Sequence, residues 1–362
     1  MPIRRQNNDD FMARRMDKRL SEMEASIASI YEEAAAEGTR RLERYLATFE
    51  ERDAVMYARY LEEEITEDEW LRWRSTHILR TQRYQATIDS LTDVLVNADI
   101  SAMALVDGNL PYVLAQSYNF TQFVGNIIAE STGLNVGTFQ IYNTRSVQAL
   151  IRDNPNLLPT VDIPLDQQWN RTQINRAVTQ GILHGDSMDR IAERFQHVAQ
   201  MDDNSAIRNA RTAVTAAENM GRNESYNFIR SQGIEMVKEW SATLDDRTRD
   251  THVLLNGTRP NEDGFFGDGI LDVLMEYPAD PRGEPQERYN CRCRLNIVPP
   301  EYSREVNQRN YDTWLRENYP DDYADVQESD MRRGKIEERQ RFYDRIPEAR
   351  RRVEERRRRR NG

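Results

Sequence analysis

Residues 234–298 read IEMVKEWSATLDDRTRDTHVLLNGTRPNEDGFFGDGILDVLMEYPADPRGEPQERYNCRCRLNIV and concentrate the Gly, Pro, Asp, His and Cys residues that the rest of the chain uses sparingly. β-Branched and aromatic residues in 234–242 predict a half-buried strand. Apolar and polar residues alternate over 289–298, which predicts a returning strand. A short helix is expected over 247–255. The stretch therefore predicts a small module of two strands and a helix, with a long turn-rich loop before the second strand.

An ordered set of polar and aromatic residues runs through this module. It consists of Trp240, Asp245, Arg249, His252 and Gly257, then a Pro-rich loop, then Asn290-Cys291-Arg292-Cys293. In this order the chain resembles the phage Mu F-type minor head protein family, also called the phage head morphogenesis domain, over roughly residues 140–300. The preceding helix departs from the family pattern at Ala213, where family members often carry Glu after Arg-Thr.

This resemblance implies a function in phage head morphogenesis. It implies a minor capsid component near the portal vertex, with the portal protein, the major capsid protein or both as partners, and no enzymatic activity is expected from the residues themselves. The expected location is the virion head, and the host cytoplasm during assembly. It also implies a part in head assembly or DNA delivery.

The residues leave an enzymatic alternative open. A metal-dependent nuclease or hydrolase would use His252 as base, with Asp245 or Asp250 orienting it or binding the metal. The module has no second His at metal-ligand spacing, and the chain has no Gly-x-Ser-x-Gly motif and no phosphate loop. These absences favour the assembly component over the hydrolase.

The two cysteines of the chain, Cys291 and Cys293, lie two residues apart. With His252 and either Asp245 or Asp250 they predict a possible structural zinc site of mixed sulfur, nitrogen and oxygen ligands. Cys-x-Cys is less specific than paired Cys-x-x-Cys motifs, so a second interpretation stays open. In that interpretation both thiols are small buried apolar groups, and His252 is a hydrogen-bonded core or loop residue.

Helical patterns precede the module. In residues 11–60 the apolar side chains begin at alternating spacings of four and three, at Met16, Leu20, Met23, Ile27, Ile30 and Ala34. This heptad spacing predicts a helix packed against another helix of the same chain or of a second copy, as in a coiled coil. A capping box at Thr66–Glu69 begins a second helical pattern. Residues 1–97 therefore predict a long helical hairpin.

The chain as a whole predicts a predominantly α-helical α+β fold. Residues 98–164 predict an irregular or helical connector with a turn at Asp107-Gly108, and 165–300 predict the head-morphogenesis domain. Within that domain a helix is expected to begin at Asp202 or Asp203. Residues 301–331 predict a helical docking segment rich in aromatic side chains, and the alternative is that these side chains pack onto the same domain.

The charge of the chain is unevenly distributed. Residues 332–362 carry thirteen Arg and one Lys against six acidic residues, a net of +8 that leaves −19 on the other residues of a chain of net charge −11. This basic segment predicts a solvated helix or tail. It also predicts an arm for packaged DNA or an acidic protein. Its terminal contacts would be Arg356, Arg357, Arg358, Arg359 and Arg360.

The amino-acid composition limits the classes to which the protein can belong. Hydrophobic residues make up 38% of the chain and charged residues 31%, which is typical of a surface-rich helical protein. The sequence has no apolar run long enough for a signal peptide or a membrane span, so no membrane partner is expected. Two cysteines in 362 residues are consistent with a reducing compartment.

Overall fold

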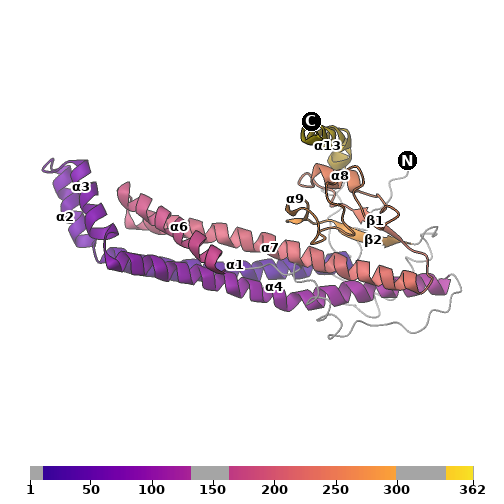
Figure 1. Ribbon diagram of the computed structural model, residues 1–362. Coiled ribbons are helices and arrows are strands. Elements are labelled where there is room, and N and C mark those ends of the chain that lie inside the picture. The colour runs from indigo at the N-terminus through magenta and orange to yellow at the C-terminus, as the bar shows by residue number, and fades with distance from the viewer. Residues whose placement is uncertain (1–10, 132–162, 299–339, 362) are drawn as a thin grey trace. The chain divides into compact units, whose positions relative to one another are not determined.

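A computed structural model describes residues 11–131, 163–298 and 340–361 (Figure 1). The described ranges are mostly helical, and their one sheet has two antiparallel strands. The expected predominantly helical α+β class is confirmed. The expected docking segment 301–331 and the connector residues 132–162 lie outside the described residues.

The chain divides into two compact units, which are described separately. The module unit comprises Met1–Ser21, Asp107–Leu158 and Arg211–Gly362, and the bundle unit comprises Glu22–Val106 and Pro159–Ala210. Helices α1, α4 and α7 contribute residues to both. The described helices that precede β1 are α1 (Phe11–Ala47), α2 (Glu50–Leu61), α3 (Glu67–Arg74), the π-helical η2 (Ser75–Leu79), α4 (Gln82–Ser131), α6 (Ile163–Leu183) and α7 (Met188–Ser231).

The apolar seam expected in α1 is confirmed at four of its six positions, since Met16, Met23, Ile27 and Ala34 are buried. Leu20 and Ile30 are only half-buried, and Tyr31 is buried next to Ile30. A straight α-helix has 3.6 residues per turn, so a 3.5-residue pattern drifts around its surface. The capping box is confirmed, since Thr66 Oγ1 accepts from Glu69 N at 3.2 Å and Thr66 N donates to the Glu69 carboxylate at 2.9 Å.

Two helices are longer than the sequence predicts. The turn expected at Asp107-Gly108 is wrong, because α4 continues through it and through Pro111 to Ser131. Buried Val106, Leu110 and Val113 keep the helical period across this region, and side-chain packing outweighs the local cost of Gly and Pro. The hairpin end expected at residue 97 likewise lies inside α4.

The helix start expected at Asp202 or Asp203 is also wrong, because α7 is continuous from Met188 to Ser231. Both carboxylates are buried in the helix interior instead of capping its end. Their neighbours Ala199 and Ala210 are buried on the same helix and favour continuous helix.

In the bundle unit, α1 and α7 approach closely at one glycine. A Cβ atom on Gly38 would lie 2.2 Å from two carbons of the Phe195 ring. Only glycine leaves space for that ring, which is fully buried. Gly38 therefore sets how closely the two helices pack.

The module unit holds the predicted strands and short helices. Its elements are β1 (Val237–Ser241), α8 (Asp250–Leu255), α9 (Pro285–Arg288), β2 (Arg294–Val298) and α13 (Ile346–Asn361). β1 pairs antiparallel with β2 from Val237 opposite Val298 to Ser241 opposite Arg294. The long loop between α8 and α9 is ordered by a bridge in which Phe266 N donates to Met275 O at 2.7 Å. None of the described helices combines the length and apolar composition needed to cross a membrane.

The second strand begins later than expected. The sequence predicts a strand from residue 289, whereas β2 begins at Arg294 and Cys291 and Cys293 precede it. Asn290 has φ 54°, which is left-handed and incompatible with a strand. The carbonyl groups of both cysteines accept hydrogen bonds from α7 side chains in place of a neighbouring strand.

Candidate metal centre

His252 lies on α8 with its side chain directed into the module. Arg249 is the N-cap residue of this helix, and Thr251, His252 and Val253 are all buried. The Trp240 ring, from β1, packs edge-on against the imidazole with ring centroids 5.1 Å apart. The strand and the helix therefore fix the orientation of His252 from two sides.

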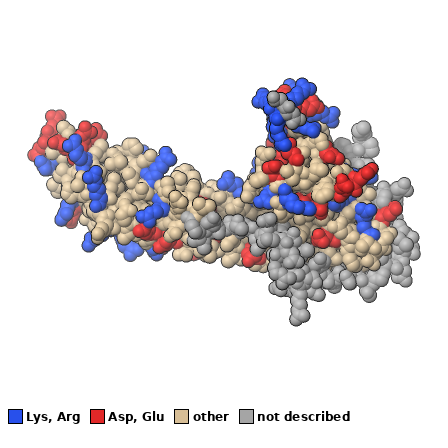
Figure 2. Space-filling model, viewed as in Figure 1, with Lys and Arg blue, Asp and Glu red and all other residues tan. Residues whose placement is uncertain are grey.

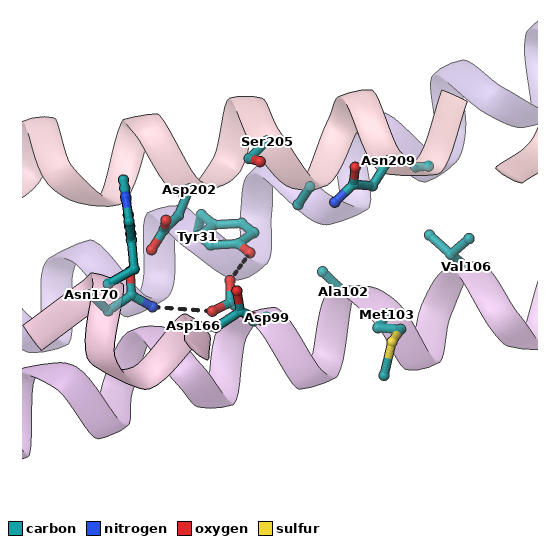
Figure 3. Close-up of a pocket in the computed structure, with 13 residues that line it drawn as sticks. Tyr31, Asp99, Ala102, Met103, Val106, Asp166, Asn170, Asp202, Ser205 and Asn209 are labelled. Atoms are coloured by element: carbon teal, nitrogen blue, oxygen red, sulfur yellow. Dashed lines mark hydrogen bonds between the residues drawn. The ribbon is translucent and has the colours of Figure 1, made fainter. Parts of the chain in front are cut away.

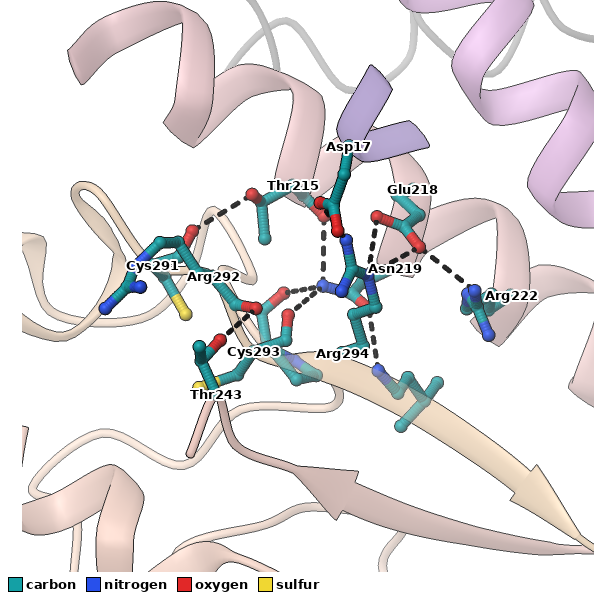
Figure 4. A network of polar contacts seen from close by, with 12 residues as sticks. Asp17, Thr215, Glu218, Asn219, Arg222, Thr243, Cys291, Arg292, Cys293 and Arg294 are labelled. Carbon is teal, nitrogen blue, oxygen red and sulfur yellow. Dashed lines mark hydrogen bonds and ion pairs between the residues drawn. The ribbon is translucent and has the colours of Figure 1, made fainter. Parts of the chain in front are cut away.

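The cysteine segment is held by polar side chains of α7, as Figure 4 shows. Thr215 Oγ1 donates to Cys291 O at 3.0 Å. Asn219 Nδ2 donates to Cys293 O at 3.0 Å, and Asn219 Oδ1 accepts from Leu295 N at 2.7 Å. Because these bonds join main-chain atoms to one fully buried amide, they fix the course of the backbone on either side of Cys293.

The structure brings three of the predicted ligands together. His252 Nδ1 lies 3.7 Å from Cys291 Sγ and 3.3 Å from Cys293 Sγ. All three donor atoms lie within 4.8 Å of one another. The residues are sealed from solvent, with exposures of 1% for His252, 0% for Cys291 and 2% for Cys293. Among the described residues this is the cluster of His, Cys, Asp and Glu side chains able to hold a metal ion.

A carboxylate faces the other nitrogen of the same ring. His252 Nε2 lies 3.2 Å from Glu287 Oε2, an ion-pair contact that is not aligned as a hydrogen bond. Thr251 Oγ1 donates to the same Glu287 oxygen at 2.7 Å. Glu287 belongs to α9, so this short helix completes the environment of the imidazole.

The buried charges of the cluster influence one another. Burial lowers the pKa of His252, but the neighbouring Cys293 and Glu287 outweigh burial and raise that pKa to about 9. Burial raises the pKa of Cys293, but the Cys291 thiol and the His252 charge bring it well below its usual range. The hydrogen bond with Cys293, followed by burial, raises the pKa of Cys291. In the absence of a metal ion the geometry thus favours a Cys293 thiolate beside a His252 imidazolium.

The two candidate aspartates do not join the cluster. Asp245 makes a two-oxygen ion pair with Arg292, one contact of which is 3.0 Å, and accepts from Thr248 Oγ1 at 3.1 Å. Burial raises the pKa of Asp245, but Arg292 outweighs burial and lowers it. Asp250 instead lies 3.4 Å from an Arg345 nitrogen. The sequence did not reveal these partners, because both arginines are distant along the chain.

The remaining motif residues shape the backbone around the cluster. The Arg249 side chain donates to the carbonyl of Tyr289. Gly257 has φ 75°, and its N–H donates to Trp240 O at 2.7 Å, which joins the end of α8 to β1. The Asn290 backbone N–H donates a hydrogen bond to Thr212 Oγ1 at 2.8 Å. These contacts join motif residues from across residues 240–293 around one compact centre.

The arginine-rich end forms helix α13, which packs against α8. Figure 2 shows basic side chains gathered over this helix, with acidic side chains of the same unit nearby. Arg356 lies 3.8 Å from Asp250, Arg360 pairs with Asp272, and Arg357 donates to Gly269 O at 2.5 Å. Arg358 and Arg359 are exposed.

A second polar cluster, missed at the sequence level, lies in the bundle unit (Figure 3). A cavity of about 120 Å³ is lined by Tyr31, Asp99, Asp166, Asn170 and Asp202, from four helices. Tyr31 donates to Asp99, and Asn170 Nδ2 donates to Asp99 Oδ2 at 3.1 Å. Burial, followed by the charges of Asp99 and Asp166, raises the pKa of Asp202 to about 8. Burial also raises the pKa of Asp99 to about 6.

Three known proteins are each similar to part of this chain. Minor head protein GP7 of Bacillus phage SPP1 is 29% identical over 188 residues, which are 49% of this chain and 59% of that protein. NAD(+)--arginine ADP-ribosyltransferase EFV of Enterococcus faecalis (strain ATCC 700802 / V583) is 29% identical over 155 residues, 42% of this chain and 31% of that protein. Uncharacterized protein YqbB of Bacillus subtilis (strain 168) is 30% identical over 128 residues, 34% of this chain and 41% of that protein.

The chain thus spans less than two thirds of each of these three relatives. No significant match to a solved structure is found. Residues 172–296 match the sequence model of the family described as Phage Mu protein F like protein, and this range contains both strand β1 and the whole candidate metal centre. The resemblance inferred from the motif is therefore confirmed: the chain carries a Phage Mu protein F like segment over residues 172–296.

Proposed function

We propose that this chain is a phage minor head protein that acts in head morphogenesis as a non-enzymatic part of the virion. The observation that carries the proposal is the family match over residues 172–296, together with the similarity to a protein named as a minor head protein. Helices of 37, 50 and 44 residues, α1, α4 and α7, support it, since long helices suit a component that bridges others in a large assembly.

The geometry of the candidate metal centre supports a structural role over a hydrolase. A hydrolase would need His252 and Asp245 in one site that a substrate can reach. Here the Asp245 carboxylate is engaged by Arg292, and His252 and both cysteines are sealed from solvent. The similarity to an ADP-ribosyltransferase covers 31% of that protein, so we base no activity on it.

The finer part of the proposal concerns partners. The chain binds near the portal vertex, in contact with the portal protein, the major capsid protein or both. The exposed guanidinium groups of Arg358 and Arg359 contact phosphates of packaged DNA, because a guanidinium group suits paired hydrogen bonds to phosphate.

Two measurements test the assembly role. Purified virions of the phage that encodes this chain are expected to contain it, by quantitative mass spectrometry. The purified chain is expected to co-migrate with the portal oligomer in size-exclusion chromatography, with the chain alone and the portal alone as controls. Absence from virions, together with separate migration from both portal and capsid proteins at every salt concentration, would overturn the proposal.

The DNA contact is tested by salt dependence. Arg358→Gln with Arg359→Gln removes two exposed charges, so the slope of log affinity against log salt for duplex DNA should become shallower by about 1.8. A matched double variant, Arg40→Gln with Arg44→Gln, removes two exposed charges of α1 and should leave the slope unchanged. Equal slopes for both double variants would show that α13 makes no phosphate contact.

A further inference from the structure

We propose that Cys291, Cys293 and His252 Nδ1 bind one structural zinc ion that joins α8 to the segment preceding β2. The two sulfur-to-nitrogen separations are close to those of a tetrahedral zinc site, and all three donor atoms lie within 4.8 Å of one another. With a Zn–S bond of about 2.3 Å and a Zn–N bond of about 2.0–2.1 Å, the edge between a sulfur and a nitrogen ligand is about 3.6 Å. The distances from His252 Nδ1 to Cys293 Sγ and Cys291 Sγ, 3.3 and 3.7 Å, lie just below and just above this edge length.

The surroundings of His252 match those of a metal-binding imidazole. A zinc-binding His commonly presents its second nitrogen to a carboxylate, which orients the ring and makes the bound nitrogen more basic. Glu287 lies 3.2 Å from Nε2 and is itself fixed by the Thr251 hydroxyl. Nδ1 is thereby left to face the two sulfur atoms.

The two sulfur ligands are held in place independently of any metal ion. Thr215 and Asn219 bind the carbonyl groups of Cys291 and Cys293 from α7, and the Thr243 hydroxyl donates to Arg292 O at 2.8 Å. Three consecutive carbonyl groups are thus fixed by three side chains. A site preorganised in this way loses little conformational entropy when it binds a metal ion.

Burial and chain connectivity indicate a structural ion. The donors are separated by 39 and 41 residues, so the ion closes a long loop that contains little regular structure. Such a cross-link restricts the unfolded chain. Because all three ligands are buried, the fourth position is filled by a small ligand such as water, with no substrate access. The ion binds two thiolates and an unprotonated Nδ1, so the displaced protons pass to solvent.

Zinc is favoured over calcium and magnesium by the chemistry of the donors. Two thiolates and one imidazole form a soft to borderline set, which suits zinc and disfavours calcium or magnesium. The set differs from the sequence expectation by excluding Asp245 and Asp250, whose carboxylates are engaged by arginines.

The full-length chain, expressed with added zinc and dialysed without chelator, is expected to retain about one zinc per chain by elemental mass spectrometry. X-ray absorption at the zinc edge should show two sulfur ligands and an imidazole. Cobalt added to the metal-free chain should give the absorption band of thiolate-to-cobalt charge transfer. These measurements use the unmodified chain, so they do not depend on whether a variant folds.

Variants then identify the ligands. Cys291→Ser and Cys293→Ser should each reduce zinc affinity at least about tenfold, and Glu287→Gln should reduce it by about 10-fold to 100-fold. Asp245→Asn is the matched control and should retain zinc. Circular dichroism of each variant checks that the helices remain.

Three results would overturn the proposal. These are a zinc-free wild-type chain that gives no cobalt charge-transfer band, a zinc environment without sulfur, and a loss of zinc in Asp245→Asn equal to that in Cys293→Ser. The outcome is separate from the head-assembly proposal, since metal content is measured on the isolated chain.

Discussion

Asp202→Asn is expected to remove a loss of stability that the bundle unit undergoes as pH rises. Asp202 is 8% exposed on α7 and faces Tyr31 of α1, Asp99 of α4, and Asp166 and Asn170 of α6. Asn has nearly the same shape as the protonated carboxyl group and cannot ionise. The substitution therefore tests the charge with little change in packing.

The magnitude follows from the shifted pKa. The folded chain holds a proton on Asp202 up to about pH 8, whereas the unfolded chain releases it near 3.8. Between these values the unfolded state binds fewer protons, so stability falls as pH rises, by about 1.4 kcal/mol per pH unit. From pH 5 to pH 7 the loss is about 3 kcal/mol. Asp99 titrates in this range too, but Asp202 is mainly protonated there, so the Asp99 contribution is common to both proteins and cancels in their difference.

Hydrogen exchange of peptides from α6 and α7, measured by mass spectrometry on the full chain, reports the stability of this unit without requiring both units to unfold together. Comparing wild type and variant at the same pH removes the intrinsic pH dependence of exchange. The ratio of wild-type to variant exchange rates should increase by about 100-fold between pH 5 and pH 7. Asp189→Asn, an exposed position on the same helix, is the control. A ratio that stays constant within about threefold would refute the reasoning, because 3 kcal/mol corresponds to about two powers of ten.

Two further predictions concern packing and the backbone of the cysteine segment. Asn219→Ala leaves Leu295 N and several buried carbonyl groups without their hydrogen-bond partner. The free energy of unfolding, measured in urea, should therefore fall by about 3 kcal/mol, and the Leu295 amide hydrogen should exchange faster. Unchanged exchange at Leu295 would contradict the role of the amide. Gly38→Ala should destabilise the chain by about 1–3 kcal/mol, because the methyl group would overlap the Phe195 ring. Gly108→Ala is its matched control, because a Cβ atom there meets nothing within 4 Å. The free energy of unfolding, measured by thermal unfolding, should rise by about 0.5–1 kcal/mol in this variant. Equal effects at the two glycines would count against the close approach.

Local chemistry in the sequence predicted much of the fold. The α1 seam and the Thr66 capping box depend on residues within a few turns of one another, and both could be recognised without tertiary information. The wrong boundaries in α4 and α7 have one cause. Asp107-Gly108 and Asp202-Asp203 carry strong local signals for a turn or a cap, and long-range burial of neighbouring apolar residues overrides them.

The candidate metal centre was predictable only in part. The order of His252, Cys291 and Cys293 indicated a shared site, and the structure places the three together. Asp245 and Asp250 are kept out of the cluster by contacts with arginines 47 and 95 residues away. No local sequence pattern indicates these contacts. The polar residues Thr215 and Asn219 lie four apart on one face of α7, a signal that could have indicated a polar interface but not its partner.

The acidic cavity was not predictable. Asp99, Asp166 and Asp202 come from three helices, and each carboxylate alone is compatible with a solvent-facing position. Their proximity arises from how the helices pack, which depends on apolar contacts such as that between Gly38 and Phe195.

The pairing of β1 with β2 has a consequence for synthesis of the chain on the ribosome. Ser241 pairs with Arg294 and Val237 pairs with Val298. Each residue of β1 is therefore synthesised 53 to 61 positions before its pairing partner in β2. Until then the nascent chain presents an unpaired strand edge and the large apolar Trp240 side chain, which are the features that promote misassociation. A translational pause or a premature stop within the loop before β2 should therefore direct the product to chaperones or proteases, while a pause after Val298 has left the ribosome should not.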